Sequence, residues 1–126
     1  MKPETKNDIN LARIKTVQDY IRLHYGDELK LSELAALANL VPTSLCHIFK
    51  AYTEHTVSDF ITEVRIKKAA DKLLNTNETV KGIAYECGFS TLTNFNRHFK
   101  KFMGCTPTEL RAQYQRTTKQ KITNQY

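Results

Sequence analysis

Hydrophobic residues recur at helical spacing along nearly the whole chain. Near its start Ile14, Val17 and Ile21 follow one another at intervals of three and four residues, which predicts an amphipathic helix over about 10–25. The segments that follow keep the same period, and none alternates between apolar and polar residues as a half-buried strand would. The pattern therefore predicts an all-α fold, and seven helices account for it.

Local start and stop signals divide this pattern into separate helices. Ser32 precedes a run of strong helix formers and is the expected N-cap of the second helix, while Pro42 suits the first turn of a third helix that ends near Tyr52. Thr106, Pro107 and Glu109 form a complete start signal for the last helix. The other helices are expected at about 56–74, 80–86 and 91–102.

Two parts of the chain repeat each other. Leu34 corresponds to Ile83 forty-nine positions later, and after one inserted residue the offset becomes fifty, so that Leu45 corresponds to Phe95. Each copy reads as a short helix, a tight turn and a second helix, with Asn39 or Gly88 expected at positive φ in the turn. In a helix-turn-helix the second helix enters the major groove of DNA.

The repeat gives the domain organisation that we expect. It comprises a flexible N-terminus or linker (1–9), a first helix-turn-helix subdomain (10–55), a linker helix (56–75), a second subdomain (76–112) and a basic flexible tail (113–126). A helix of about 18 residues is about 27 Å long, close to the roughly 34 Å between successive major-groove faces. Two recognition helices on one chain are thus expected to reach adjacent grooves, with some bending of the DNA.

Charge is distributed unevenly along the chain. The formal net charge is +6, yet residues 1–96 carry twelve basic and twelve acidic side chains, so the whole surplus lies in residues 97–126. A concentrated positive charge suits a polyanion such as nucleic acid.

The second helix of the second copy has two different faces. Projection at 100° per residue puts Phe95, Phe99 and Phe102 on a buried face. Thr93, Arg97 and Lys100 point to the opposite side with Asn96 at its margin; the outward positions of the first copy are Thr43, Cys46, His47 and Lys50. Asn and Arg read base edges and Lys binds phosphates, so the second copy is the stronger candidate for reading DNA.

The stretch GIAYECGFSTLTNFNRHFKKFMGCTPTELR (82–111) closely resembles the signature of the AraC/XylS family of bacterial transcription regulators, and residues 10–112 resemble its DNA-binding domain. The resemblance implies seven helices, two helix-turn-helix units and sequence-specific binding to promoter DNA in adjacent major grooves. It also implies regulation of transcription, with activation through RNA polymerase as the usual mode.

The resemblance also assigns site residues. The expected base-reading residues are Thr43, Cys46, His47, Leu92, Thr93, Asn96 and Arg97, and the expected phosphate-binding residues are Ser44, Lys50, Asn94, Lys100 and Lys101. The first copy departs from the family at three places. Val41 replaces a Ser cap, Glu54 replaces a Gly, and Cys46-His47 replaces a polar–Arg pair. The two readers are therefore expected to contribute unequally.

Other functions have less support in the sequence. Three separated cysteines without ligand spacing disfavour a disulfide framework or a redox or metal sensor, and no catalytic motif indicates an enzyme. A helical interaction module without DNA binding remains an alternative, and it predicts little salt dependence of any DNA association. We expect no catalytic residue, metal, cofactor or membrane contact, a cytoplasmic location, and a monomer unless a dimerising sensor domain belongs to the same protein. The sequence leaves open the promoter, the signal, activation versus repression, and whether the chain stands alone.

Overall fold

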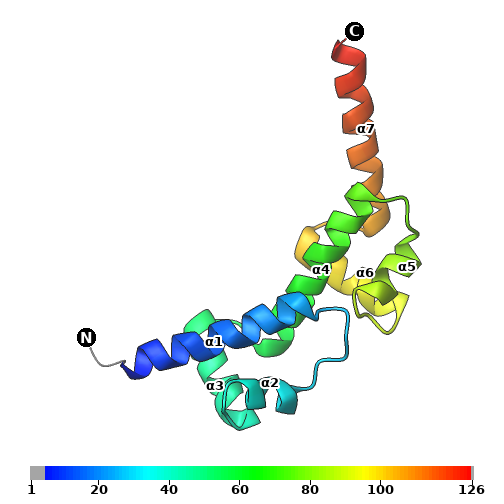
Figure 1. Ribbon diagram of the computed structural model, residues 1–126. Coiled ribbons are helices and arrows are strands. Elements are labelled where there is room, and N and C mark those ends of the chain that lie inside the picture. The colour runs from blue at the N-terminus through cyan, green and yellow to red at the C-terminus, as the bar shows by residue number, and fades with distance from the viewer. Residues whose placement is uncertain (1–4, 126) are drawn as a thin grey trace. The chain divides into compact units, whose positions relative to one another are not determined.

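The computed structural model describes the backbone of residues 5–125 and the side chains of residues 5–117. Seven α-helices and no strand occur in this part of the chain, which confirms the all-α prediction (Figure 1). The helices are α1 (Lys6–Leu23), α2 (Leu31–Leu37), α3 (Pro42–Thr53), α4 (Val57–Asn75), α5 (Val80–Glu86), α6 (Leu92–Met103) and α7 (Pro107–Gln125). The chain forms two compact units, unit 1 (1–64) and unit 2 (65–126), and the division falls within α4.

The first helix begins earlier than predicted. The N–H of Asp8 donates to Oγ1 of Thr5 at 3.1 Å, and the N–H of Thr5 donates to Oδ2 of Asp8 at 3.2 Å. This capping box starts α1 at Lys6, so the predicted start near residue 10 is wrong and residues 6–9 are helical. The predicted flexibility or linker role of these residues stays a prediction. Residues 1–4 of that predicted terminus lie outside the described residues.

Two further helix ends differ from expectation. Ser32 is the second residue of α2 rather than its cap, because the helix starts after Lys30, which makes no side-chain capping bond. The start signal of α7 is confirmed, since Thr106 and Glu109 form a reciprocal pair at 3.1 and 3.2 Å. This helix continues to Gln125, beyond residue 112, where the second subdomain was predicted to end. The predicted flexibility of 113–126 stays a prediction for the described residues, and residue 126 lies outside them.

The core of unit 1 joins α1, α2 and α3 to the start of α4. The fully or almost fully buried side chains are Ile14, Val17, Ile21, Leu34, Ala35, Ala38, Leu45, Phe49, Val57 and Val64. Removing such aliphatic and aromatic groups from water is the main favourable term in folding a domain of this size.

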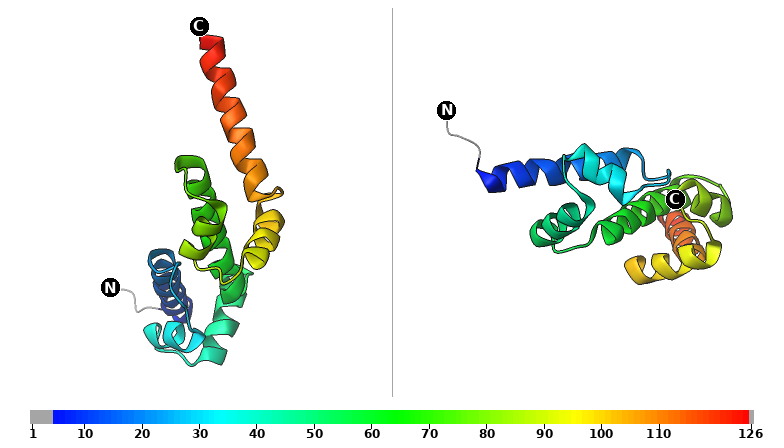
Figure 2. Two further views of the ribbon diagram at one scale, coloured as in Figure 1. Left: turned by 90° about the vertical axis from the view of Figure 1, so that its right-hand side faces the viewer. Right: turned by 90° about the horizontal axis from the view of Figure 1, so that it is seen from below.

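Unit 2 buries the corresponding positions of the repeat. Ile83, Ala84, Phe95 and Phe99 are all fully buried, like their counterparts in unit 1. α5 and α6 pack together, and α6 packs against α7 (Figure 2). The sequence repeat thus reflects two copies of one packing arrangement.

Both copies also share the turn between their two helices. Asn39 has φ of 57° and Gly88 has φ of 101°, which confirms the predicted left-handed residues. In each copy the N–H of the following residue donates to the carbonyl at the end of the first helix, from Leu40 to Ala35 at 2.9 Å and from Phe89 to Ala84 at 3.0 Å. These are Schellman bonds, which end a helix and fix the direction of the next.

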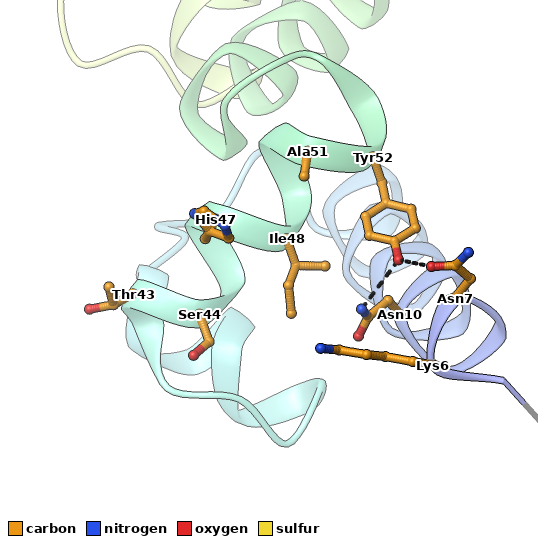
Figure 3. A pocket seen from close by; sticks show the side chains of 9 residues that line it. All are labelled: Lys6, Asn7, Asn10, Thr43, Ser44, His47, Ile48, Ala51 and Tyr52. Carbon is orange, nitrogen blue, oxygen red and sulfur yellow. Dashed lines mark hydrogen bonds between the residues drawn. The ribbon is translucent and has the colours of Figure 1, made fainter.

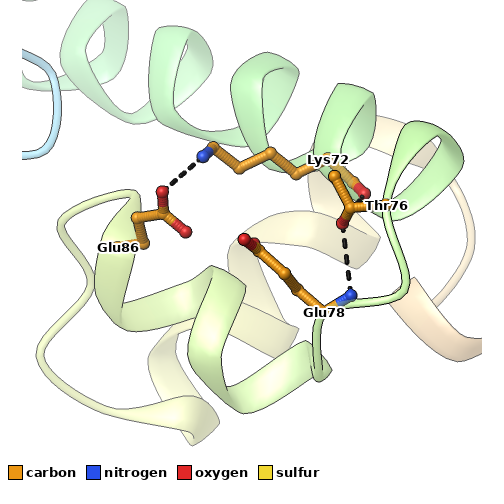
Figure 4. A network of polar contacts seen from close by, with 4 residues as sticks. All are labelled: Lys72, Thr76, Glu78 and Glu86. Carbon is orange, nitrogen blue, oxygen red and sulfur yellow. Dashed lines mark hydrogen bonds and ion pairs between the residues drawn. The ribbon is translucent and has the colours of Figure 1, made fainter.

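Polar contacts from neighbouring helices stabilise α4 within unit 2. The Nζ of Lys72 on α4 binds Oε1 of Glu86 on α5 at 2.5 Å (Figure 4). The Arg111 side chain of α7 donates to the carbonyls of Leu73 and Thr76 at 3.0 and 3.2 Å. Arg111 belongs to the basic surplus of the sequence, but its guanidinium caps α4 instead of being presented to a polyanion.

Candidate nucleic-acid interface

The α6 helix has well-defined ends that set its orientation in unit 2. The hydroxyl of Thr91 accepts a hydrogen bond from the N–H of Asn94 at 3.1 Å, and Gly104 ends the helix with φ of 78°. Phe95 and Phe99 are fully buried, as predicted. Phe102 is 38% exposed, so its predicted burial is wrong; it lies in the last turn of α6, beyond the core of the unit.

The polar candidates on α6 share the side away from the buried phenylalanines. Exposed side chains are those of Thr93, Asn96, Arg97, Lys100 and Lys101, while those of Leu92 and Asn94 are half-buried. All seven predicted residues of this helix therefore have side-chain surface open to solvent. An amide, a guanidinium and two ammonium groups along one helix suit contact with base edges and with phosphates.

Two of these side chains contact each other. The Nη2 of Arg97 donates to Oδ1 of Asn94 at 2.5 Å, across one helical turn. The backbone N–H of the same Asn94 donates the capping bond to the hydroxyl of Thr91. The guanidinium is thereby linked through Asn94 to the rigid start of the helix.

The α3 helix of unit 1 has the same burial pattern with different chemistry. Its candidates Thr43, Cys46, His47 and Lys50 are exposed, and Ser44 is half-buried. Leu45 and Phe49 hold the helix to the core. The outward face thus carries a thiol and an imidazole where α6 carries Asn96 and Arg97.

The ends of α3 bear out two of the departures noted in the sequence. Val41 occupies the N-cap position and makes no side-chain capping bond. Glu54 occupies the C-cap position with φ of 66°, a conformation that favours glycine. Both features make the ends of α3 less stable than those of α6.

A cavity of about 630 Å³ lies between α1 and α3 in unit 1 (Figure 3). The exposed candidates Thr43 and His47 lie on its border, and Lys6 and Asn7 of α1 line its other side. Sequence reasoning missed these two α1 residues because it started the helix at residue 10. The Thr5–Asp8 capping box was the signal that could have found them.

The structure provides no group of metal-binding side chains among the residues that it describes. Cys46 is exposed, Cys105 is half-buried and Cys87 is buried at the end of α5. Burial raises the pKa of the Cys87 thiol to about 11. Within residues 5–125 no single helix is long and apolar enough to cross a membrane.

The chain resembles known regulators in sequence. It is 30% identical over 111 residues to the HTH-type transcriptional activator RhaR of Mannheimia succiniciproducens, an alignment that covers 88% of this chain and 40% of RhaR. The chain spans between 14% and 40% of the length of such curated relatives.

Solved structures show the same fold. A probable AraC family transcriptional regulator from Rhodopseudomonas palustris superposes with a TM-score of 0.77 at 25% identity, covering 82% of this chain and 97% of the other. The DNA-binding domain of AdpA in complex with a target DNA superposes with a TM-score of 0.78 at 22% identity, covering 83% and 95%. The sequence model of a helix-turn-helix domain matches residues 34–113, more than half of the chain. The chain therefore belongs to the AraC-type family of helix-turn-helix DNA-binding domains.

Proposed function

We propose that the chain binds double-stranded promoter DNA in a sequence-specific way and regulates transcription, with α3 and α6 as its two recognition helices in adjacent major grooves. The observation that carries the proposal is the division of α6 into two faces. Phe95 and Phe99 are fully buried, while Asn96 and Arg97 are exposed on an unobstructed polar side. The RhaR relative is named as an activator, which supports activation, with RNA polymerase as partner.

The roles of individual residues follow from their chemistry. Arg97 offers a bidentate guanidinium to a guanine, and Asn96 offers an amide that pairs with an adenine. Thr93 and Leu92 contact neighbouring base edges. Lys100 and Lys101 neutralise phosphates. The Asn94 side chain accepts from Arg97 through Oδ1 and donates from its Nδ2 amide group to the DNA backbone.

The first unit contributes less to base reading in this proposal. Thr43, Cys46 and His47 provide small or weak base contacts, while Ser44 and Lys50 bind phosphates. Sequence preference is accordingly expected to be stronger in the half-site read by α6. The proposal places the protein in the cytoplasm as a monomer, or in a dimer where a longer protein supplies a sensor domain.

The test compares Arg97→Ala with Lys100→Ala on DNA selected for tight binding and on a scrambled sequence. Loss of a guanine contact costs about 1–3 kcal/mol of discrimination, so Arg97→Ala should weaken binding to the selected DNA by about five- to 150-fold more than binding to the scrambled DNA. Lys100→Ala should weaken both equally and reduce the salt dependence. Equal losses on both DNAs for Arg97→Ala would remove the base-reading role.

The same DNA titrations, repeated at several salt concentrations, distinguish the proposal from the alternative of a helical interaction module that does not bind DNA. It predicts that wild-type binding to any DNA changes little between low and moderate salt. The DNA-binding proposal predicts a steep linear fall of log affinity with log salt concentration.

A further inference from the structure

The cavity between α1 and α3 is built so that the first turn of α1 has a fixed place beside the recognition helix. The hydroxyl of Tyr52 on α3 donates to Oδ1 of Asn7 on α1 at 2.6 Å. Nδ2 of Asn10 donates to the same hydroxyl at 3.4 Å (Figure 3). Asn10 is only 5% exposed, so its end of this polar link is shielded from water, while Asn7 is exposed. These side-chain contacts hold the start of α1 beside α3, and the capping box keeps that first turn helical.

Lys6 projects from this fixed turn into the cavity. Figure 3 shows its ammonium end directed across the opening toward the α3 side, where Ser44 and Ile48 lie. The border also holds Thr43 and His47, and no carboxylate occurs among the described residues that line the cavity. The cavity thus combines one cation with hydroxyl and imidazole donors, which is chemistry for an anion.

The position of Lys6 does not serve the helix itself. A cation at the first position of an 18-residue helix is opposed by the positive end of the helix dipole. Its ammonium group is instead presented to whatever enters the cavity. Replacing it with a neutral residue should leave the helix as stable as before or slightly more stable.

We propose that this cavity seats one backbone phosphate of the DNA bound by α3, with Lys6 as its charge partner and Ser44 as a hydrogen-bond donor. The inference rests on the proposed function, since the cavity borders Thr43 and His47 of the recognition face. A duplex lying on that face brings its phosphates to the edge of the same helix. The contact positions unit 1 on DNA and offsets the weak base readers of α3.

The experiment measures DNA affinity of the full chain against salt concentration for Lys6→Gln, with Lys15→Gln as matched control. Lys15 is exposed on the same helix, nine residues along and hence on the opposite side. Lys6→Gln should make the log–log salt slope less steep by about 0.9 and weaken binding to selected and scrambled DNA alike. Lys15→Gln should match the wild type, and Lys6→Arg should retain the wild-type slope.

Ser44→Ala and a titration with inorganic phosphate complete the test. Ser44→Ala should weaken binding without changing the slope, because a hydroxyl carries no charge. A wild-type slope for Lys6→Gln overturns the proposal while the proposed function stands, provided that the wild type binds DNA. The proposal is likewise overturned if inorganic phosphate binds the wild type through Lys6 while the salt slope of DNA binding is unchanged in Lys6→Gln. The cavity would then bind a free anion and not a DNA phosphate. Failure of the wild type to bind any DNA removes both proposals.

Discussion

The starts of α3 and α6 can be tested against each other by exchanging their capping residues. Val41 and Thr91 occupy equivalent N-cap positions fifty residues apart, but only Thr91 makes a side-chain capping bond. The backbone of Val41 is extended, with φ of −81° and ψ of 155°, which is the conformation that a capping threonine adopts. Val41→Thr should therefore add to α3 the bond that α6 already has.

The size of the effect follows from the exposure of the two sites. Val41 is 63% exposed, so replacing a methyl group with a hydroxyl removes little buried apolar surface. A capping hydroxyl is worth about 1 kcal/mol. Val41→Thr should raise the free energy of unfolding of unit 1 by about that amount, and Thr91→Val should lower that of unit 2 equally. Each change corresponds to about a fivefold shift in the unfolding equilibrium.

Native-state amide hydrogen exchange is the suitable assay, because two units need not unfold in one transition. The backbone N–H of Ser44 corresponds to that of Asn94, which bonds to the Thr91 hydroxyl. Its protection should rise in Val41→Thr, and that of Asn94 should fall in Thr91→Val. If Thr91→Val destabilised unit 2 while Val41→Thr left the exchange of Ser44 unchanged, the inference that α3 lacks only a capping group would be wrong.

Three further predictions concern single sites. Glu54→Gly should stabilise unit 1 by up to about 1 kcal/mol in chemical denaturation, since glycine relieves the positive φ of 66°. Gly104→Ala should destabilise unit 2 by about 1 kcal/mol through its φ of 78° alone, because the added Cβ would meet no other atom; opposite signs would contradict this pair. The hydrogen bond from Lys72 lowers the pKa of Glu86, so this pair stabilises unit 2 above the ordinary glutamate pKa of about 4.3 and ceases to do so as pH falls through the lowered pKa. Glu86→Gln should therefore reduce the loss of stability of unit 2 at acidic pH, and a loss equal to that of the wild type would refute the role of this pair. With its pKa raised to about 11, buried Cys87 should react with a maleimide at pH 8 only as unit 2 opens, so labelling that is fast in the native protein and insensitive to urea would contradict its burial.

Local chemistry explains which elements could be predicted from the sequence. Pro42 and Gly104 mark helix ends through their own backbone preferences, and the Thr106–Glu109 box marks a start through bonds between near neighbours. The predicted cap at Ser32 was wrong because serine is a common capping residue, yet here it is the second residue of α2. The start of α1 was missed because the periodic apolar pattern becomes clear only at Ile14, so the Thr5–Asp8 box upstream of it was not connected to the helix.

Features that depend on tertiary packing could not be predicted from the sequence. Phe102 has helical spacing from Phe95, yet it lies beyond the core and is partly exposed. The bond between Arg97 and Asn94 depends on side-chain rotamers. The place of Lys6 beside α3 depends on contacts more than forty residues apart in sequence, such as that between Asn7 and Tyr52. The exposed polar faces of α3 and α6 could be predicted because each lies on a single helix, whereas the cavity needs two helices.

The most direct test of the central claim is selection of bound sequences from random double-stranded DNA, performed with the wild type and with Arg97→Ala. The wild type should enrich two short motifs about one helical turn apart, with stronger base preference in one of them. Arg97→Ala should lose a guanine preference in that stronger motif and leave the other motif unchanged. Enrichment of no motif, or of identical motifs by both proteins, would contradict sequence-specific reading by α6.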